Sequence, residues 1–178
     1  MTRRARWRGP VRPATAALSA LLLLGGCAGG PDPEEAPDRD RAVAHDLALL
    51  HALARQVQER PGVVCVAAEL VDAGGVPGVS LGDVRVLAVT EVLPVAGREA
   101  LVRDVAQQVW DAGLTAVLSL GVSVGTADAD ASTSSDIGRL LGGPDAGQVA
   151  TSSQLEAAFG PLPSPAATVP PDPGPQTC

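Results

Sequence analysis

TAVLSLGVSV, residues 115–124, alternates apolar residues with small or polar ones at a period of two. This is the period of a β-strand with one buried face, because successive side chains of a strand point to opposite sides of its sheet. The first face is predicted to carry Leu118, Leu120, Val122 and Val124, and the second Val117, Ser119, Gly121 and Ser123. The sequence therefore predicts a half-buried strand, whose apolar face needs cover from other elements.

An amphipathic helix is predicted directly before this strand, over residues 97–112. Its apolar face consists of Leu101, Val102, Val105, Val109 and Ala112. Pro94 precedes the helix, and Gly113 suits its C-terminal end because glycine tolerates the left-handed conformation found there. Further upstream, residues 63–72 and 83–93 are rich in valine and are predicted as two strands joined by a glycine-rich connector.

A first helix is predicted from Arg41 onward and is expected to end at Pro61-Gly62. Its apolar stripe consists of Val43, Leu47, Leu50, Ala54 and Val57. The element order α-β-β-α-β predicts an α+β domain over residues 41–160, with a three-stranded mixed sheet and both helices on one of its faces. This order resembles the small BON-type modules of bacterial envelope proteins, and equally a ferredoxin-like fold without its first strand.

The C-terminal third of the chain carries weaker signals. Residues 125–153 are mostly Asp, Ser, Thr, Gly and Ala, with a short helix predicted at residues 136–141 and a further helical turn at residues 154–159. Residues 161–178 contain seven prolines. Such a segment favours polyproline II over packed structure, so we expect a disordered tail that contributes nothing to folding.

The N-terminal segment has the features of an export signal. Five arginines occur within the first 12 residues, an apolar run covers residues 14–24, and Gly25-Gly26-Cys27 follows it. The run is shorter than the roughly 20 residues of a membrane-spanning helix, and it has the length of a signal-peptide core. Residues 1–27 resemble a bacterial lipoprotein signal peptide with its lipobox. The resemblance implies cleavage before Cys27 and diacylglycerol on its sulfur.

This resemblance also implies where the protein acts. Residues 1–26 would be removed, and residues 27–40, which are polar and contain three prolines, would form a lipidated flexible tether. The lipid anchor would hold the domain on the extracytoplasmic face of the cell membrane. LEAAFGP, residues 155–161, is similar to the ending of small uncharacterised lipoproteins of high-GC Gram-positive bacteria, which implies no known activity.

Charge and composition limit the partners. Removal of residues 1–26 leaves eight arginines against 20 acidic residues, a net charge of −12. Nucleic acid phosphates and anionic lipid headgroups repel such a surface, so neither is an expected partner. Few aromatic residues are present, which disfavours a pocket of stacked rings. We expect no cofactor, because the sequence contains no glycine-rich phosphate loop, Cys-x-x-Cys pair or dinucleotide fingerprint.

Two cysteines remain after lipidation, Cys65 and Cys178, and the extracytoplasmic compartment permits them to form a disulfide. Cys65 lies inside an apolar strand, where a small buried thiol is the simpler interpretation. Cys178 ends the Pro-rich tail, which is long enough to reach back. A disulfide between them would close a loop of about 100 residues and contribute up to roughly 4–5 kcal/mol in the entropic description.

One motif suggests catalysis. GVSVG, residues 121–125, matches Gly-x-Ser-x-Gly, the nucleophile elbow of α/β-hydrolases. However, Ser123 lies inside the predicted strand, no amphipathic helix follows it, and no histidine comes later in the chain. We therefore predict a solvent-facing serine whose replacement by alanine costs little, and no catalytic residue.

Two patterns suggest metal binding. His45 and His51 are the only histidines, and six residues of helix place them about 240° apart, so they cannot chelate one ion together. Both are predicted to be solvated. The Asp-x-Asp-x-Ser pattern at residues 128–132 resembles the start of a calcium loop, but Thr133 and Arg139 stand where such a loop needs glycine and a bidentate acid. We therefore expect a flexible acidic loop and no metal site.

These observations predict a membrane-anchored extracytoplasmic lipoprotein whose domain is a non-catalytic interaction or accessory module, with an envelope protein as its partner. The alternatives are an envelope hydrolase that uses Ser123 and a weak cation-binding protein. The latter would use Asp128, Asp130 and Asp136. A pocket that unites Ser123 with a histidine and an acid would favour the hydrolase, whereas an exposed apolar strip on the open face of the sheet would favour a partner site.

Replacing Cys27 by serine is expected to abolish lipidation and to leave the precursor unprocessed at this site, because the thiol accepts the lipid. Metabolic labelling with a fatty acid, followed by membrane fractionation, measures both effects. A Cys27→Ser protein that still carries label would contradict the lipoprotein interpretation.

Overall fold

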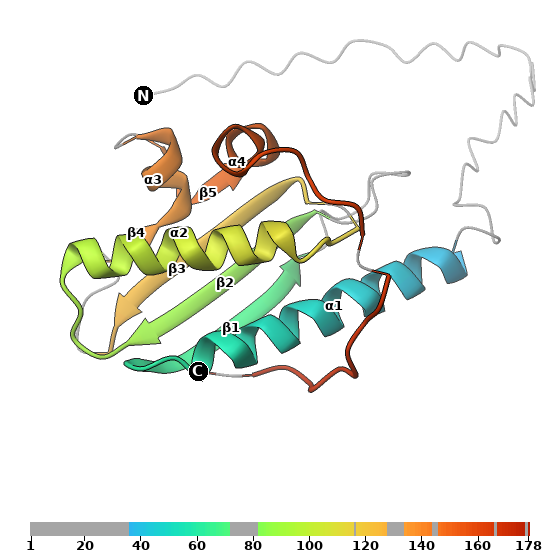
Figure 1. Cartoon of the computed structure of the whole chain (residues 1–178), viewed down its shortest axis with the longest axis horizontal. Helices are drawn as coiled ribbons and strands as arrows, with labels where there is room; N and C mark the ends of the chain where they lie inside the picture. The colour runs from blue at the N-terminus through green and yellow to red at the C-terminus, as the bar shows by residue number, and fades with distance from the viewer. Residues whose placement is uncertain are drawn as a thin grey trace, which may run out of the picture.

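A mixed β-sheet covered on one face by two long helices forms the domain (Figure 1). The computed structural model describes residues 36–71, 82–115, 117–127, 134–143, 146–165, 167–176 and 178, with side chains from residue 40 onward. The expected signal peptide, the lipidation site Cys27 and the first part of the expected tether lie outside these residues.

The described elements follow the predicted order and then continue. They are α1 (Ala36–Gln58), β1 (Val63–Val71), β2 (Asp83–Thr90), α2 (Val95–Asp111), β3 (Ser119–Thr126), β4 (Ser135–Asp136), α3 (Ile137–Gly142), β5 (Val149–Thr151) and α4 (Ser152–Phe159). β1 pairs antiparallel with β2, and β2 pairs parallel with β3. The other edge of β3 is shared by β4 and β5, both antiparallel to it.

The α+β class and the mixed sheet are as predicted, but the number of elements is not. The described sheet has five strands where three were predicted, and four helices occur where the fold prediction counted two. β4 and β5 have only two and three residues, which is too short for an alternating pattern to be visible in the sequence. They exist because β3 has a free edge whose backbone groups need partners.

The core lies between the sheet and the two long helices. The sheet contributes Val66, Ala68, Val84, Val86, Ala88, Leu120, Val122 and Val124. From the helices come Leu50, Leu53, Ala54, Val57, Val102, Val105, Ala106 and Val109. The predicted alternation therefore holds for β3 itself. It fails just before the strand, where Leu118 is 48% exposed and Val117 is buried, because β3 begins only at Ser119.

Local signals determine where the helices end. α2 follows Pro94 and is succeeded by Gly113, whose φ of 67° lies in the left-handed region as predicted. α1 begins at Ala36, five residues before the predicted start at Arg41, so residues 36–40 of the expected tether are helical. α4 starts with a capping box in which Thr151 and Gln154 bond each other's backbone N–H groups.

α3 and α4 close one edge of the core. Gly138 in α3 approaches β5 so closely that a Cβ atom there would lie 2.2 Å from the carbonyl oxygen of Gly147, which only glycine avoids. The indole N–H of buried Trp110 donates to the carbonyl of Gly160 at 3.0 Å. This hydrogen bond attaches the end of α4 to α2. The C-terminal segment from residue 161 onward begins directly after it.

The prediction of a disordered tail is wrong. Residues 161–178, which we call the strap, leave α4 and run along α1 to end beside β1 (Figure 1). The described strap residues form neither helix nor strand, but they make specific contacts with α1 and β1. Proline removes backbone donors without preventing such contacts, so proline content is consistent with the absence of helix and strand in the described strap but gave no sign of the docking.

Val105→Asp is expected to unfold the domain, because it places an unpaired carboxylate at a fully buried position of α2 facing the sheet, a change that costs several kcal/mol. Gln107→Asp puts the same residue on the exposed side of the same helix and is expected to change stability by less than about 0.5 kcal/mol. Circular dichroism and thermal melts compare the two. A folded Val105→Asp protein would contradict the helix phase.

Candidate functional site

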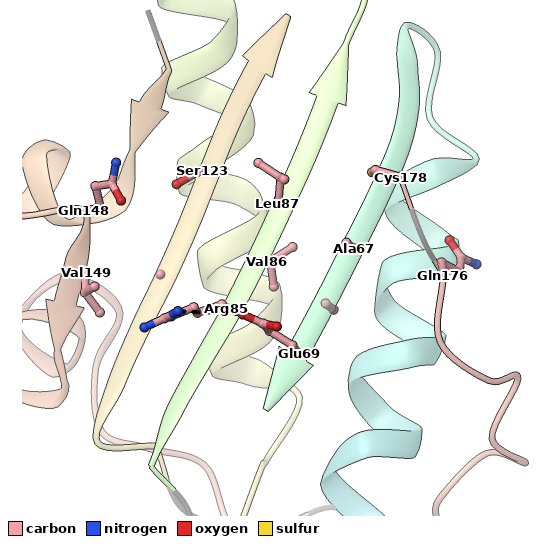
Figure 2. Close-up of a pocket in the computed structure, with 12 residues that line it drawn as sticks. Ala67, Glu69, Arg85, Val86, Leu87, Ser123, Gln148, Val149, Gln176 and Cys178 are labelled. Carbon is pink, nitrogen blue, oxygen red and sulfur yellow. Dashed lines mark ion pairs between the residues drawn. The ribbon is translucent and has the colours of Figure 1, made fainter. Parts of the chain in front are cut away.

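The sheet face that α1 and α2 leave uncovered carries a groove of about 670 Å³ (Figure 2). The groove is lined by Ala67, Ala68, Glu69, Arg85, Val86, Leu87, Gly121, Ser123, Gln148, Val149, Gln176 and Cys178. Its floor therefore comes from β1, β2 and β3. One wall comes from the chain at β5, and the opposite wall from the end of the strap (Figure 2).

The groove follows from the sizes of neighbouring side chains in the sheet. Leu87 pairs with Ala67 on one side and with Ser123 on the other, so one large side chain stands between two small ones. Arg85 lies between Glu69, which is also large, and the small Gly121. Because cross-strand neighbours share a face, Ala67 on β1 and the small residues Gly121 and Ser123 on β3 leave hollows beside β2.

The groove offers mixed chemistry. Leu87 is 45% exposed and Val149 is exposed at the edge, which gives an apolar surface. Arg85 and Glu69 form an ion pair at 3.8 Å between exposed side chains, which contributes little stability. The side-chain carbonyl oxygen of Gln176 is buried and has no hydrogen-bond partner among the described residues. An unsatisfied buried acceptor is unfavourable, so a donor from outside would gain by reaching it.

Ser123 faces the groove, on the sheet side opposite the helices, as the alternation predicted. It is not a free, solvated serine, because its hydroxyl donates to the carboxylate of buried Asp136, its partner across β3 and β4. Ser134 also donates to Asp136, at 3.3 Å, and Arg139 lies 3.7 Å from it. The cluster therefore holds β4 and the start of α3 against β3.

The hydrolase arrangement is not assembled around Ser123. Both histidines belong to α1, which covers the other face of the sheet, and neither lines the groove. Asp136 is occupied by three neighbours within the protein. Asp128 and Asp130 of the cation-binding alternative lie outside the described residues, and within the described part of the chain no group of His, Cys, Asp or Glu could hold a metal ion.

His51 was predicted to be solvated, and this prediction is wrong. Its side chain is buried, and its Nδ1–H donates to the carboxylate of Asp172 in the strap at 2.7 Å. The pKa of Asp172 is lowered, first because the backbone N–H of Gly174 donates to it and then because of the bond to His51. The ionised carboxylate of Asp172 therefore stabilises the docked strap fully at pH values above its ordinary pKa. This stabilisation is lost as the pH falls through the lowered pKa.

His45 is only partly exposed and donates to Asp46 at 2.9 Å. Asp46 is fully buried and also accepts hydrogen bonds from the backbone N–H and the hydroxyl of Thr115. This carboxylate connects α1 to the segment between α2 and β3, and bonds from charged acceptors are stronger than neutral ones. It is a structural contact that sequence reasoning missed, because its partners are 69 residues apart.

A disulfide joins Cys65 to Cys178 across 113 residues of sequence. Cys65 lies on the open side of β1, so the interpretation as a buried core thiol is wrong. Arg55 of α1 donates to the carbonyl of Pro173 at 3.1 Å and adds a second contact near the strap's end. Together these contacts place Gln176 and Cys178 at the rim of the groove.

Ser123→Ala is expected to destabilise the domain by about 1–2 kcal/mol, because it deprives a buried carboxylate of a hydrogen-bond donor. This replaces the expectation of a negligible cost. Ser164→Ala, at an exposed strap position, serves as the control and should cost less than about 0.5 kcal/mol. Chemical denaturation measures both, and equal midpoints for the two variants would show that the Asp136 cluster contributes no stability.

None of the helices in the described ranges is both long and apolar enough to span a bilayer. Compared with known proteins, the chain matches no family model, no curated protein and no solved structure. The groove and its chemistry are therefore the basis for any functional argument.

Proposed function

We propose that the protein is a membrane-anchored extracytoplasmic lipoprotein, and that its α+β domain is a non-catalytic interaction module that binds an envelope protein through the groove. The anchor rests on the lipobox resemblance at Cys27. The binding site rests on one observation: an open, partly apolar sheet face with a groove at its centre, bounded on two sides by other segments.

The chemistry of the groove favours a polypeptide as the bound partner. Hollows over Ala67 and Ser123 accept an aliphatic side chain beside Leu87, and Gln148 and Gln176 can exchange hydrogen bonds with backbone amides. No aromatic residue lines the groove, so stacking with a sugar or a nucleobase is unsupported. The nearby Glu69–Arg85 pair offers one charge of each sign at one end.

A hydrolase receives less support, because the hydroxyl of Ser123 is engaged by a buried acid that is itself shared with Ser134 and Arg139. A nucleophilic serine needs a neighbouring base that can take up its proton and then release it. Asp136 at the centre of a satisfied cluster is better suited to holding β4 in place.

In-cell photo-crosslinking tests the binding site. A photoreactive amino acid at Leu87, in the groove floor, is expected to give a defined crosslinked protein, whereas the same amino acid at Val92, 82% exposed outside the groove, is not. Ala67→Trp fills the hollow beside Leu87 and should abolish that product. Val64→Trp, on the same strand but not lining the groove, is the matched control. Equal products at Leu87 and Val92 would contradict the proposed site.

A further inference from the structure

The covalent link at Cys65–Cys178 joins the strap to the open face of β1, an edge strand of the described sheet. We propose that this disulfide is a thiol-exchange site: its reduction releases the strap from a domain that stays folded, and so removes one wall of the groove. The release follows from the structure alone, whereas its effect on binding rests on the proposed function.

Few noncovalent contacts hold the strap beyond Gly160. Its carboxylate at Asp172 is 48% exposed, and the bond from Arg55 to Pro173 lies at the surface. Leu162 and Val169 remain 39% and 38% exposed, and none of the described strap residues belongs to the buried core. Among the described residues, no backbone hydrogen bond connects the strap to β1 or α1. A segment with so few contacts opens at a much lower free energy than the core does.

The core has its own attachments and does not depend on the strap. Leu155 of α4 is fully buried, and Trp110 holds the carbonyl of Gly160 directly before the strap begins. The hydrogen bond from Trp110 to Gly160 therefore lies before the first residue of the strap, and release of the strap leaves it intact. Reduction should free residues 161–178 while α2 and α4 remain packed.

The chemistry is an exchange with a dithiol reductant. One thiolate of the reductant attacks the sulfur of Cys178, which is exposed, while Cys65 is half-buried and leaves as a thiolate that takes up a proton. The second thiol of the reductant then attacks the mixed disulfide and releases Cys178 as a thiol. Overall, one disulfide is reduced to two thiols, and the reductant is oxidised to its own disulfide.

The consequence for the groove is direct, because Gln176 and Cys178 supply one of its walls. In the oxidised protein the disulfide holds them beside Ala67 on β1 (Figure 2). Release of the strap removes the Gln176 carbonyl and opens that side of the groove. A partner that needs both walls would therefore bind only the oxidised protein.

Backbone ¹⁵N relaxation of the strap and hydrogen exchange of the core, both measured on the full-length protein in detergent micelles before and after treatment with dithiothreitol, test the release. Reduction should lower the ¹H–¹⁵N heteronuclear NOE of the strap amides, which belong to Ala167, Thr168, Val169, Asp172, Gly174 and Gln176, to the values of an unstructured peptide, with hydrogen exchange in α2 and α4 nearly unchanged. Cys178→Ser should reproduce this result without reductant. A strap that stays ordered in either case would overturn the proposal, and so would loss of exchange protection in α2, since the disulfide would then be required for folding.

The crosslinking assay separates this inference from the proposed function. Crosslinking from Leu87 in wild type, together with its loss in Cys178→Ser, is the expected result. An equal product in Cys178→Ser would overturn redox control of the groove and leave the binding site standing. No product from Leu87 in either protein would contradict the proposed function, while the ¹⁵N relaxation measurement still decides whether the strap is released.

Discussion

Valine and leucine side chains of β2 and β3 share one buried hydrophobic core with the valines of α2, and the other elements are placed relative to this core. Val84 and Val86 lie beside Leu120 and Val122 in parallel register, and Val105 of α2 belongs to the same buried cluster. Each such side chain contributes about 1.5–3 kcal/mol when fully buried. Because the layer lies on only one face of the sheet, the opposite face is left for other uses.

The open face acquires its shape from residues that the core does not need. On the covered side of the three long strands, apolar side chains fill the space, whereas on the open side the large Leu87 of β2 stands between the small Ala67 of β1 and Ser123 of β3. The end of the strap, at Gln176 and Cys178, borders this face, and the described strap residues form neither helix nor strand. The fold thus combines a floor of paired strands with a wall that one disulfide and the contacts of Asp172 and Pro173 with α1 hold in place.

Sequence patterns predicted the long elements, in which a pattern of apolar residues repeats several times. The apolar faces of α1, α2 and β3 were visible because burial imposes periods of 3.6 and 2 on them. Shorter features were not visible. β5 has three residues, and the bond between Ser123 and Asp136 connects two strands through a register that no local pattern encodes. The phase of Ser123 was predicted correctly, but its partner was not.

The sequence by itself determined the α+β class, the order of the main elements and the faces that α1, α2 and β3 bury, since these depend on local periodicity. Only the tertiary structure decided that His51 is buried, that Cys65 meets Cys178, and that a Pro-rich segment docks instead of remaining free. Each of these outcomes requires two groups more than 100 residues apart to meet. Their meeting depends on the path of the whole chain, which is determined by the packing of the core.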